Sequence, residues 1–169
     1  MKYVILGGVA AGTKAAAKLK RLDRQAQVTI FTKGQDISYA GCGLPYYIGG
    51  DIPTREGLIV NSPAKYAGLT GAQVQTGCEA VGVDSARKQV SIRRADGSTF
   101  TETYDKLIIA TGAVPFVPPV EGVGLSGAFC VRTPDDAVQI REYAEKNNCR
   151  KAVVCGGGFI GLEVEENIA

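Results

Sequence analysis

The stretch SYAGCGLPYYIGG, residues 38–50, holds a single cysteine between two glycines. Pro45 follows three residues after Cys42, and proline is favoured in the first turn of a helix, where its missing N–H is not needed. The glycine pair that closes the stretch suits the end of that helix. Cys42 is therefore predicted at or just before a helix N-terminus, whose partial positive charge favours a nucleophilic thiolate. The alternative is a small buried cysteine in a glycine-rich loop.

A glycine-rich turn, GGVAAG at residues 7–12, follows an apolar strand expected at residues 2–6. A helix is expected at residues 13–22 and a second apolar strand at residues 28–32. Together these segments have the size of a dinucleotide-binding strand–helix–strand unit. In such a unit the glycines allow a tight turn, and backbone N–H groups bind a pyrophosphate over the helix N-terminus.

This unit departs from the usual nucleotide fingerprint in two places. The GxGxxG pattern has Gly7 and Gly12 at its ends but Val9 at its middle position. The second strand ends in Thr32 and Lys33, where an acidic residue normally accepts a hydrogen bond from the ribose. A hydroxyl interacts with the ribose more weakly than a carboxylate does. The affinity for the cofactor is therefore expected to be reduced.

A second glycine turn lies near the end of the chain. Its sequence, GGGFIG at residues 156–161, is a complete fingerprint; it follows an apolar strand expected at residues 151–155 and precedes helix-forming residues up to Ala169. Because one strand and one helix do not close a doubly wound domain, the chain is expected to be an N-terminal piece of a longer protein or a shortened gene product. The alternative is a natural protein whose last helix packs on the first domain.

The segments between the two turns predict an α/β class, a Rossmann-like parallel sheet combined with an antiparallel meander, in a truncated form. The run at residues 107–110 is apolar on both faces, as expected of a buried parallel strand, and ends in Thr-Gly. Three prolines in residues 113–125 indicate a linker. The remaining expected elements are a short helix near residues 63–69, strands at 72–76, 79–84, 88–94 and 99–103, of which the last three form the meander, and a helix at 135–147.

Composition narrows the class of protein. The 169 residues are 45% hydrophobic and 21% charged, with a net charge of +2 and neither Trp nor His. This is enough chain for one domain and part of a second. It contains no signal peptide and no apolar run approaching the ~20 residues of a membrane span. The five cysteines lack metal-ligand spacing. These features favour a cytoplasmic protein with reduced thiols and without metal, nucleic-acid or membrane partners.

The order of the motifs resembles a known family. A glycine-rich strand–turn–helix, the SYxxCGLPYYIGG segment, the YDxLIIATGAxP segment at residues 104–115 and a second strand–GGGFIG–helix follow one another. This order is similar to that of the flavoprotein pyridine nucleotide-disulfide oxidoreductases, and within them to the single-cysteine branch of coenzyme A disulfide reductases, NADH oxidases and NADH peroxidases. The resemblance implies that residues 1–112, with the meander at 79–103, begin an FAD-binding domain. Residues 113–125 would be a linker, and residues 126–169 would begin an NAD(P)-binding domain.

The resemblance also implies roles for individual residues. The first glycine turn would hold the FAD pyrophosphate, and the second would hold NAD(P)H. The full-length protein is expected to be a homodimer. The expected FAD contacts are Gly7, Gly8, Val9, Ala10, Ala11, Gly12, Thr32, Lys33, Ala80, Val81, Ala110, Thr111, Gly112 and Arg132, and the expected NAD(P)H contacts are Gly156, Gly158, Phe159, Ile160, Gly161 and Glu163.

The resemblance further implies a mechanism centred on Cys42. Dithiol members of the wider family carry a second cysteine five residues earlier, where this chain has Ile37. One redox sulfur must then cycle as a mixed disulfide or as a sulfenic acid. Hydride would pass from NAD(P)H to FAD and on to oxidised Cys42, which reduces a small disulfide such as coenzyme A disulfide.

Two alternatives to this function remain open. One is an NADH oxidase or peroxidase; those members carry a histidine in the first glycine turn, where this chain has Ala10, so disulfide reduction is favoured. The other concerns the chain alone, which is expected to be an inactive partial domain that binds FAD weakly or not at all.

Three cations are candidates for a substrate contact. Lys14, Lys18 and Arg21 fall on one face of the first helix, and together with Ser38 they resemble family positions that meet coenzyme A. A solvated basic face is the alternative for the cations. The four cysteines other than Cys42 are expected to be small apolar fillers of the core.

Overall fold

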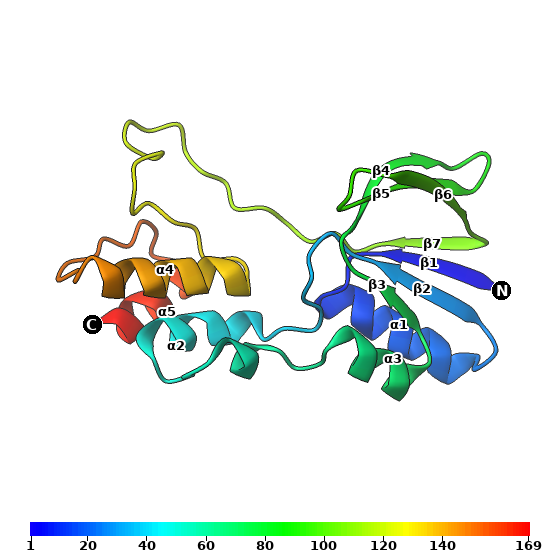
Figure 1. The fold of residues 1–169 in the computed structure, drawn as a ribbon, viewed down its shortest axis with the longest axis horizontal. Coiled ribbons are helices and arrows are strands. Elements are labelled where there is room, and N and C mark those ends of the chain that lie inside the picture. The colour runs from blue at the N-terminus through cyan, green and yellow to red at the C-terminus, as the bar shows by residue number, and fades with distance from the viewer. The chain divides into compact units, whose positions relative to one another are not determined.

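The computed structural model describes residues 1–169, which fold into two compact units (Figure 1). The first unit consists of residues 1–39 and 59–112, and the second of residues 40–58 and 113–169. The domain limits expected from the sequence remain a prediction. None of the helices is both long and apolar enough to cross a membrane.

The first unit is built on a parallel sheet with the strand order β3-β2-β1-β7. In the register of this sheet, Val4 lies opposite Thr29 on one side and Leu107 on the other. Because all three strand pairs are parallel, the carboxyl ends of the strands lie at one edge, which is where ligands bind in sheets of this kind. The four strands are β1 (Lys2–Leu6), β2 (Gln27–Phe31), β3 (Gln73–Gln75) and β7 (Lys106–Ile109).

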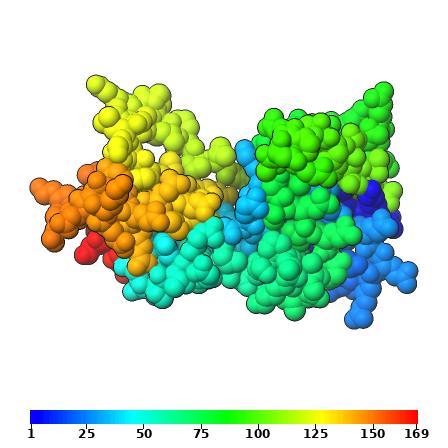
Figure 2. Space-filling view, viewed as in Figure 1, coloured from blue at the N-terminus to red at the C-terminus, as the bar shows by residue number.

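Helices cover one face of this sheet and a second sheet covers the other (Figure 1). Because side chains alternate between the faces of a strand, β1 directs Ile5 towards the helices, and Val4 and Leu6 towards the second sheet. Little of the dark-blue β1 is visible in Figure 2, since its neighbours enclose it. The covering elements are α1 (Ala10–Leu22) and α3 (Pro63–Thr70) on one face, and the antiparallel meander of β4 (Cys78–Asp84), β5 (Gln89–Arg94) and β6 (Thr99–Thr103) on the other.

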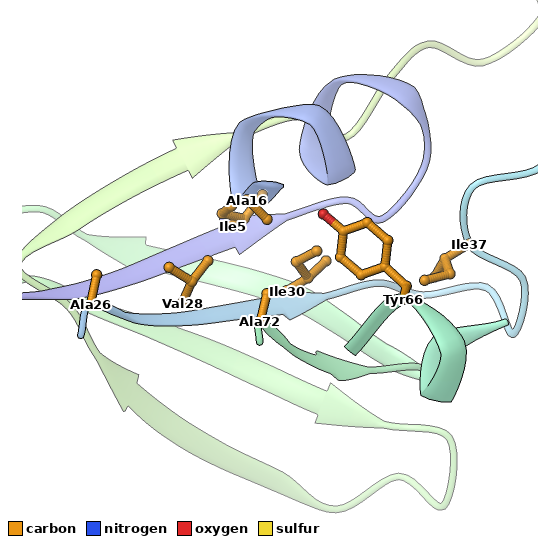
Figure 3. Packing of buried hydrophobic residues seen from close by; sticks show 8 residues of the cluster. All are labelled: Ile5, Ala16, Ala26, Val28, Ile30, Ile37, Tyr66 and Ala72. Atoms are coloured by element: carbon orange, nitrogen blue, oxygen red, sulfur yellow. The ribbon is translucent and has the colours of Figure 1, made fainter. Parts of the chain in front are cut away.

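Tyr66 joins α3 to α1 inside the helix-side core. Its side chain is 5% exposed, and its hydroxyl donates a hydrogen bond to the carbonyl of Thr13 in α1. Figure 3 shows the ring beneath α1, with the hydroxyl oxygen directed at the helix. Burial raises the pKa of the Tyr66 phenol, because the charged phenolate is disfavoured away from water. The other buried members of this cluster are Ile5, Ala16, Ala26, Val28, Ile30, Ile37 and Ala72.

We expect Tyr66→Phe to lower the free energy of unfolding by about 1 kcal/mol at neutral pH, because it removes a hydrogen bond to a buried carbonyl. Since the pKa of folded Tyr66 lies above its usual 10.0, the unfolded chain loses this proton first, and the wild type loses stability as the pH rises beyond that value. The phenylalanine variant has no such loss. Urea denaturation should therefore show a smaller difference between the two proteins at alkaline pH than at pH 7, and a constant difference would contradict the assignment.

The second unit contains the cysteine stretch. Its buried core consists of Leu44, Tyr47, Leu58 and Ala137, and α2 packs against both α4 and α5. The elements of this unit are η1 (Gly41–Gly43), α2 (Leu44–Gly49), η2 (Arg55–Leu58), α4 (Pro134–Lys146) and α5 (Phe159–Ile168), where η denotes a 3-10 helix.

Arg141 of α4 holds the carboxyl end of α2. Its Nη1 lies 3.3 Å from the carbonyl oxygen of Tyr47, 3.4 Å from that of Ile52 and 3.3 Å from that of Pro53. The guanidinium also lies 5.1 Å from the centre of the Tyr47 ring. The Tyr47 carbonyl also accepts the N–H of Gly50, so Arg141 adds a second donor there. In the turn after the helix it supplies a donor to the carbonyls of Ile52 and Pro53.

Most expected elements are confirmed within three residues of their limits, but two expectations are wrong. The strand expected at residues 151–155 does not form, because a strand needs a neighbour to complete its ladder of hydrogen bonds and the second unit contains no strand. The other error concerns β7. It pairs with β1 in parallel as expected, yet it is the edge of the sheet, and Ile109 is 66% exposed instead of buried.

Candidate nucleotide-binding turns and redox cysteine

The first glycine turn connects β1 to α1 at the carboxyl edge of the sheet. Gly7 has a φ of +107°, a conformation that side chains other than glycine rarely adopt. A Cβ on Gly12 would lie 1.8 Å from the carbonyl oxygen of Gly7, and a Cβ on Gly7 would lie 2.1 Å from that of Ala110. The two glycines therefore allow the backbones of the turn, of α1 and of the chain after β7 to approach closely.

The second glycine turn repeats this geometry in the other unit. Gly156 has a φ of +120°, and a Cβ on Gly161 would lie 2.0 Å from the carbonyl oxygen of Gly156. Val9 and Gly158 are the N-cap residues of α1 and α5, with φ of −98° and −78°. Any residue can adopt a negative φ. This position therefore does not require the positive φ that favours glycine, although Val9 interrupts the sequence fingerprint.

The helices that follow the two turns begin without a capping side chain. Neither α1 nor α5 has a side-chain hydrogen bond at its N-cap or an acidic residue in its first turn. In contrast, Ser62 caps α3 and Thr133 caps α4. The first-turn N–H groups of α1 and α5 are thus available to an anion, and the helix dipole favours negative charge there.

These features fit the pyrophosphate of a dinucleotide, which requires a tight turn, close approach of the backbone and a helix N-terminus. The first turn contains the expected contacts Gly8 and Val9, and α1 begins with Ala10 and Ala11. The expected contacts of the second turn continue into α5, which contains Phe159, Ile160, Gly161 and Glu163.

Four of the expected FAD contacts, Thr32, Lys33, Ala80 and Val81, lie on two neighbouring segments of the first unit. The N–H of Cys78 donates to the carbonyl of Thr32 over 2.9 Å, so β4 begins beside the end of β2. Thr32 is 7% exposed and Lys33 is exposed. On β4, Ala80 is half-buried and Val81 is 48% exposed. The structure therefore brings these four residues to one region.

An ion-pair network that the sequence did not predict joins these segments. Glu79 Oε1 lies 3.0 Å from Lys33 Nζ, and Glu79 Oε2 lies 2.6 Å from Arg93 Nη2. The hydrogen bond from Arg93, and then that from Lys33, lowers the pKa of the Glu79 carboxyl below its usual value. The only sequence signal was a glutamate on a later strand together with the missing acid at Thr32, and local patterns do not show that the two strands are neighbours.

The chain after β7 also reaches the first glycine turn. The N–H of Ala110 donates to the carbonyl of Leu6 over 2.8 Å. Thr111 and Gly112 follow as exposed residues. Arg132, the remaining expected FAD contact, belongs to the second unit, where it is half-buried and its Nε donates to the carbonyl of Ala113 over 3.1 Å.

Lys14, Lys18 and Arg21 are exposed along α1, and none of them forms a hydrogen bond or ion pair. Ser38 adopts a φ of +50°, and its N–H donates to the carbonyl of Gly8 over 3.1 Å. The first unit therefore offers three cations that no carboxylate of the chain neutralises, and a serine beside the first glycine turn.

Cys42 lies in η1, directly before α2, as the sequence predicts. It is exposed and forms no disulfide. Pro45 occupies the first turn of α2, and Gly50 ends the helix with a φ of +99°. An exposed sulfur without a cysteine partner is accessible to a disulfide from outside the chain.

The two glycines beside Cys42 have different surroundings. A Cβ on Gly41 would meet no atom within 4 Å, whereas a Cβ on Gly43 would lie 3.1 Å from Ile52 Cδ1 and 3.1 Å from Leu58 Cδ2. Only Gly41 faces open space. The missing side chain of Gly43 makes room for the core rather than for a ligand.

We expect Gly43→Ala to destabilise the second unit by about 1–2 kcal/mol, because the new methyl group would overpack a core in which Leu58 is fully buried. Gly41→Ala, the matched control, should change the free energy of unfolding by less than about 0.5 kcal/mol. Urea denaturation followed by circular dichroism measures both. Equal losses in the two variants would contradict the difference between these positions.

The expectation for the other cysteines is correct only for Cys78, which is buried. Cys130, Cys149 and Cys155 are exposed. Their expected role as core fillers is wrong because all three lie outside the helices and strands, in segments that have no core to fill.

The chain matches a protein-family model described as pyridine nucleotide-disulphide oxidoreductase over residues 1–168. An NAD(P)H sulfur oxidoreductase (CoA-dependent) of Pyrococcus abyssi is 42% identical over 163 residues, which are 96% of this chain and 36% of the relative. An NADH oxidase of Methanocaldococcus jannaschii is 37% identical over 97% of this chain and 37% of the relative. A coenzyme A disulfide reductase of Staphylococcus aureus is 33% identical over 99% of this chain and 38% of the relative. The chain thus spans less than two fifths of each relative.

Solved structures share the fold. Reduced Bacillus anthracis CoADR-RHD has 37% sequence identity and a TM-score of 0.95, covering 99% of this chain and 30% of that one. An NAD-dependent persulfide reductase from A. fulgidus has 39% identity and a TM-score of 0.94, covering 99% of this chain and 32% of that one. The α/β class with a parallel sheet and an antiparallel meander is therefore confirmed.

Proposed function

Because the chain belongs to the pyridine nucleotide-disulphide oxidoreductase family, we propose that it forms the N-terminal part of an FAD- and NAD(P)H-dependent reductase of a low-molecular-weight disulfide. The observation that carries the proposal is Cys42, exposed in the turn before α2 and without a cysteine partner. Ile37, at the position of the second cysteine of dithiol members, is fully buried. The chemistry therefore depends on one sulfur.

The two glycine turns supply the nucleotide sites of the proposal. The uncapped N-terminus of α1 would hold the pyrophosphate of FAD, and that of α5 would hold the pyrophosphate of NAD(P)H. Once bound, FAD would relay two electrons from NAD(P)H to the oxidised sulfur. The glycines at both turns keep side chains away from the phosphates.

Cys42 performs the chemistry on the disulfide. Its thiolate attacks one sulfur of the substrate, which forms a mixed disulfide with Cys42 and releases the first product thiolate. Uptake of two electrons then cleaves the mixed disulfide, which regenerates the Cys42 thiolate and releases the second product thiolate. No sulfur other than that of Cys42 needs to change its oxidation state in the protein.

The proposed substrate is a disulfide of the coenzyme A type. The three unneutralised cations of α1, Lys14, Lys18 and Arg21, suit its phosphate groups, and Ser38 is proposed as a further contact. Relatives named for coenzyme A support this choice. Replacing all three cations with glutamine should weaken the binding of adenosine 3′,5′-bisphosphate, measured by NMR titration, and should leave the reaction of Cys42 with uncharged hydroxyethyl disulfide unchanged.

The 169-residue chain itself allows a test of the thiol chemistry. Incubation with coenzyme A disulfide, followed by mass spectrometry of the peptides, should find the mixed disulfide at Cys42 sooner than at Cys130, which is also an exposed free cysteine. If all exposed cysteines were modified at the same rate, Cys42 would not be unusually reactive, and the proposal would lose its support.

An NADH oxidase is the second candidate, because one relative carries that name at 37% identity. Oxygen consumption by the full-length enzyme in the absence of a disulfide would identify it. Ala10 and the absence of histidine favour the disulfide reductase. We further propose that the full-length enzyme is a cytoplasmic homodimer. The chain alone is proposed to be inactive and to bind FAD weakly or not at all, and the flavin absorbance of the purified chain tests this directly.

A further inference from the structure

The end of β2 lacks the acidic residue that normally binds the ribose in a dinucleotide fold. Thr32 occupies this place, yet it is only 7% exposed. A Cβ on Gly8 would lie 3.1 Å from Thr32 Cβ and 3.1 Å from Thr32 Cγ2, so the methyl side of Thr32 faces the glycine turn. An uncharged and nearly buried side chain is a poor partner for a ribose.

A carboxylate from another strand stands beside this position. β4 begins next to the end of β2, where the N–H of Cys78 donates a hydrogen bond to the carbonyl of Thr32. The following residue is Glu79, whose Oε1 therefore lies 3.0 Å from Lys33 Nζ. The Glu79 side chain is 32% exposed. It is therefore both close to the end of β2 and open to a ligand.

The environment of Glu79 suits an acceptor of hydrogen bonds. Lys33 and Arg93 hold its two oxygens in place, and an ionised carboxylate still has lone pairs left after accepting from two donors. The two cations and one carboxylate carry a net positive charge, so the group as a whole does not repel the pyrophosphate of a dinucleotide.

We propose that Glu79 is the ribose-binding acid of the first unit, supplied by the meander in place of the missing acid at the end of β2. This inference rests on the proposed binding of FAD to the first glycine turn. Lys33 and Arg93 act as positioning residues, because they fix the carboxylate rather than contact the ribose themselves.

The competing explanation is that Glu79 only ties β2 to the meander. An exposed ion pair of that kind contributes little to stability. The two roles differ in a measurable way, because a ribose-binding acid makes affinity depend on the ribose hydroxyls, whereas a structural ion pair does not. Arg93→Gln breaks the same network from its other end and leaves the carboxylate in place.

The test compares FAD with an analogue whose adenosine carries 2′,3′-dideoxyribose, in calorimetric titrations of the full-length apoprotein. Wild type should bind FAD about tenfold more tightly than the analogue. In Glu79→Ala this preference should fall to within about twofold. Arg93→Gln should retain most of it. Glu102→Ala should retain all of it, because Glu102 pairs with Lys2 at the start of β1, away from the carboxyl ends of the strands.

The inference is overturned if Glu79→Ala keeps the tenfold preference while its thermal denaturation matches that of wild type. It is also overturned if wild type binds FAD and the analogue equally well, since a purely structural ion pair gives no dependence on the ribose hydroxyls. A full-length wild-type apoprotein that binds neither ligand would instead overturn the proposed FAD site itself.

Discussion

Replacing Cys42 with serine should lower the turnover of coenzyme A disulfide by the full-length enzyme at least about 1,000-fold, an effect of the size seen when a catalytic nucleophile is removed. A serine hydroxyl is not ionised at neutral pH and forms no mixed disulfide, so neither half of the proposed cycle can occur. The exposed position of Cys42 in η1 makes it accessible without any rearrangement of its own turn.

The matched control for this variant is Cys130→Ser, which also removes one exposed free thiol. It should turn over the disulfide at the wild-type rate. Flavin absorbance should be the same in all three proteins, because Cys42 is not part of the glycine turn that would bind FAD. Near-normal turnover by Cys42→Ser would refute the single-sulfur mechanism.

Gly12→Ala should have the second large effect, on folding and on nucleotide binding together. Its new methyl group would lie 1.8 Å from the carbonyl oxygen of Gly7, a backbone atom that cannot rotate away. Either α1 or the turn must move, at a cost of about 3 kcal/mol to the free energy of unfolding. The movement should also abolish binding of FAD, because it displaces the first-turn N–H groups of α1.

Gly68→Ala in α3 is the control, because a Cβ there would meet no atom within 4 Å. It should raise the stability of the first unit by up to about 1 kcal/mol, as expected for glycine replaced inside a helix. Urea denaturation and FAD titration of both variants make the comparison. A Gly12→Ala protein with wild-type stability would show that the tight contact at the turn is not required.

The sequence predicted those parts of the fold that depend on residues close together in the chain. The short apolar runs located β1 and β2, and the spacing of glycines located both glycine turns. Pro45 and the glycine pair after it located α2, and with it the placement of Cys42. These signals are local because each describes a turn, a cap or a side-chain period within one segment.

The parts that the sequence did not predict depend on which segments become neighbours. A strand was predicted at residues 151–155, but no strand of the second unit is available to pair with it. Ile109 was predicted to be buried, but its strand β7 is the edge of the sheet. The contact of Glu79 with Lys33 and the three bonds from Arg141 to backbone carbonyls join residues far apart in the chain. No local pattern encodes such contacts.

The uncapped beginnings of α1 and α5 have a thermodynamic consequence. The side chains of Ser62 and Thr133 cap their own helices, whereas no side chain of the chain caps α1 or α5. A nucleotide that binds only the folded form raises the melting temperature according to its concentration relative to its dissociation constant. If each turn holds the nucleotide proposed for it, the resistance of each unit to unfolding should follow the concentration of that nucleotide in the cell.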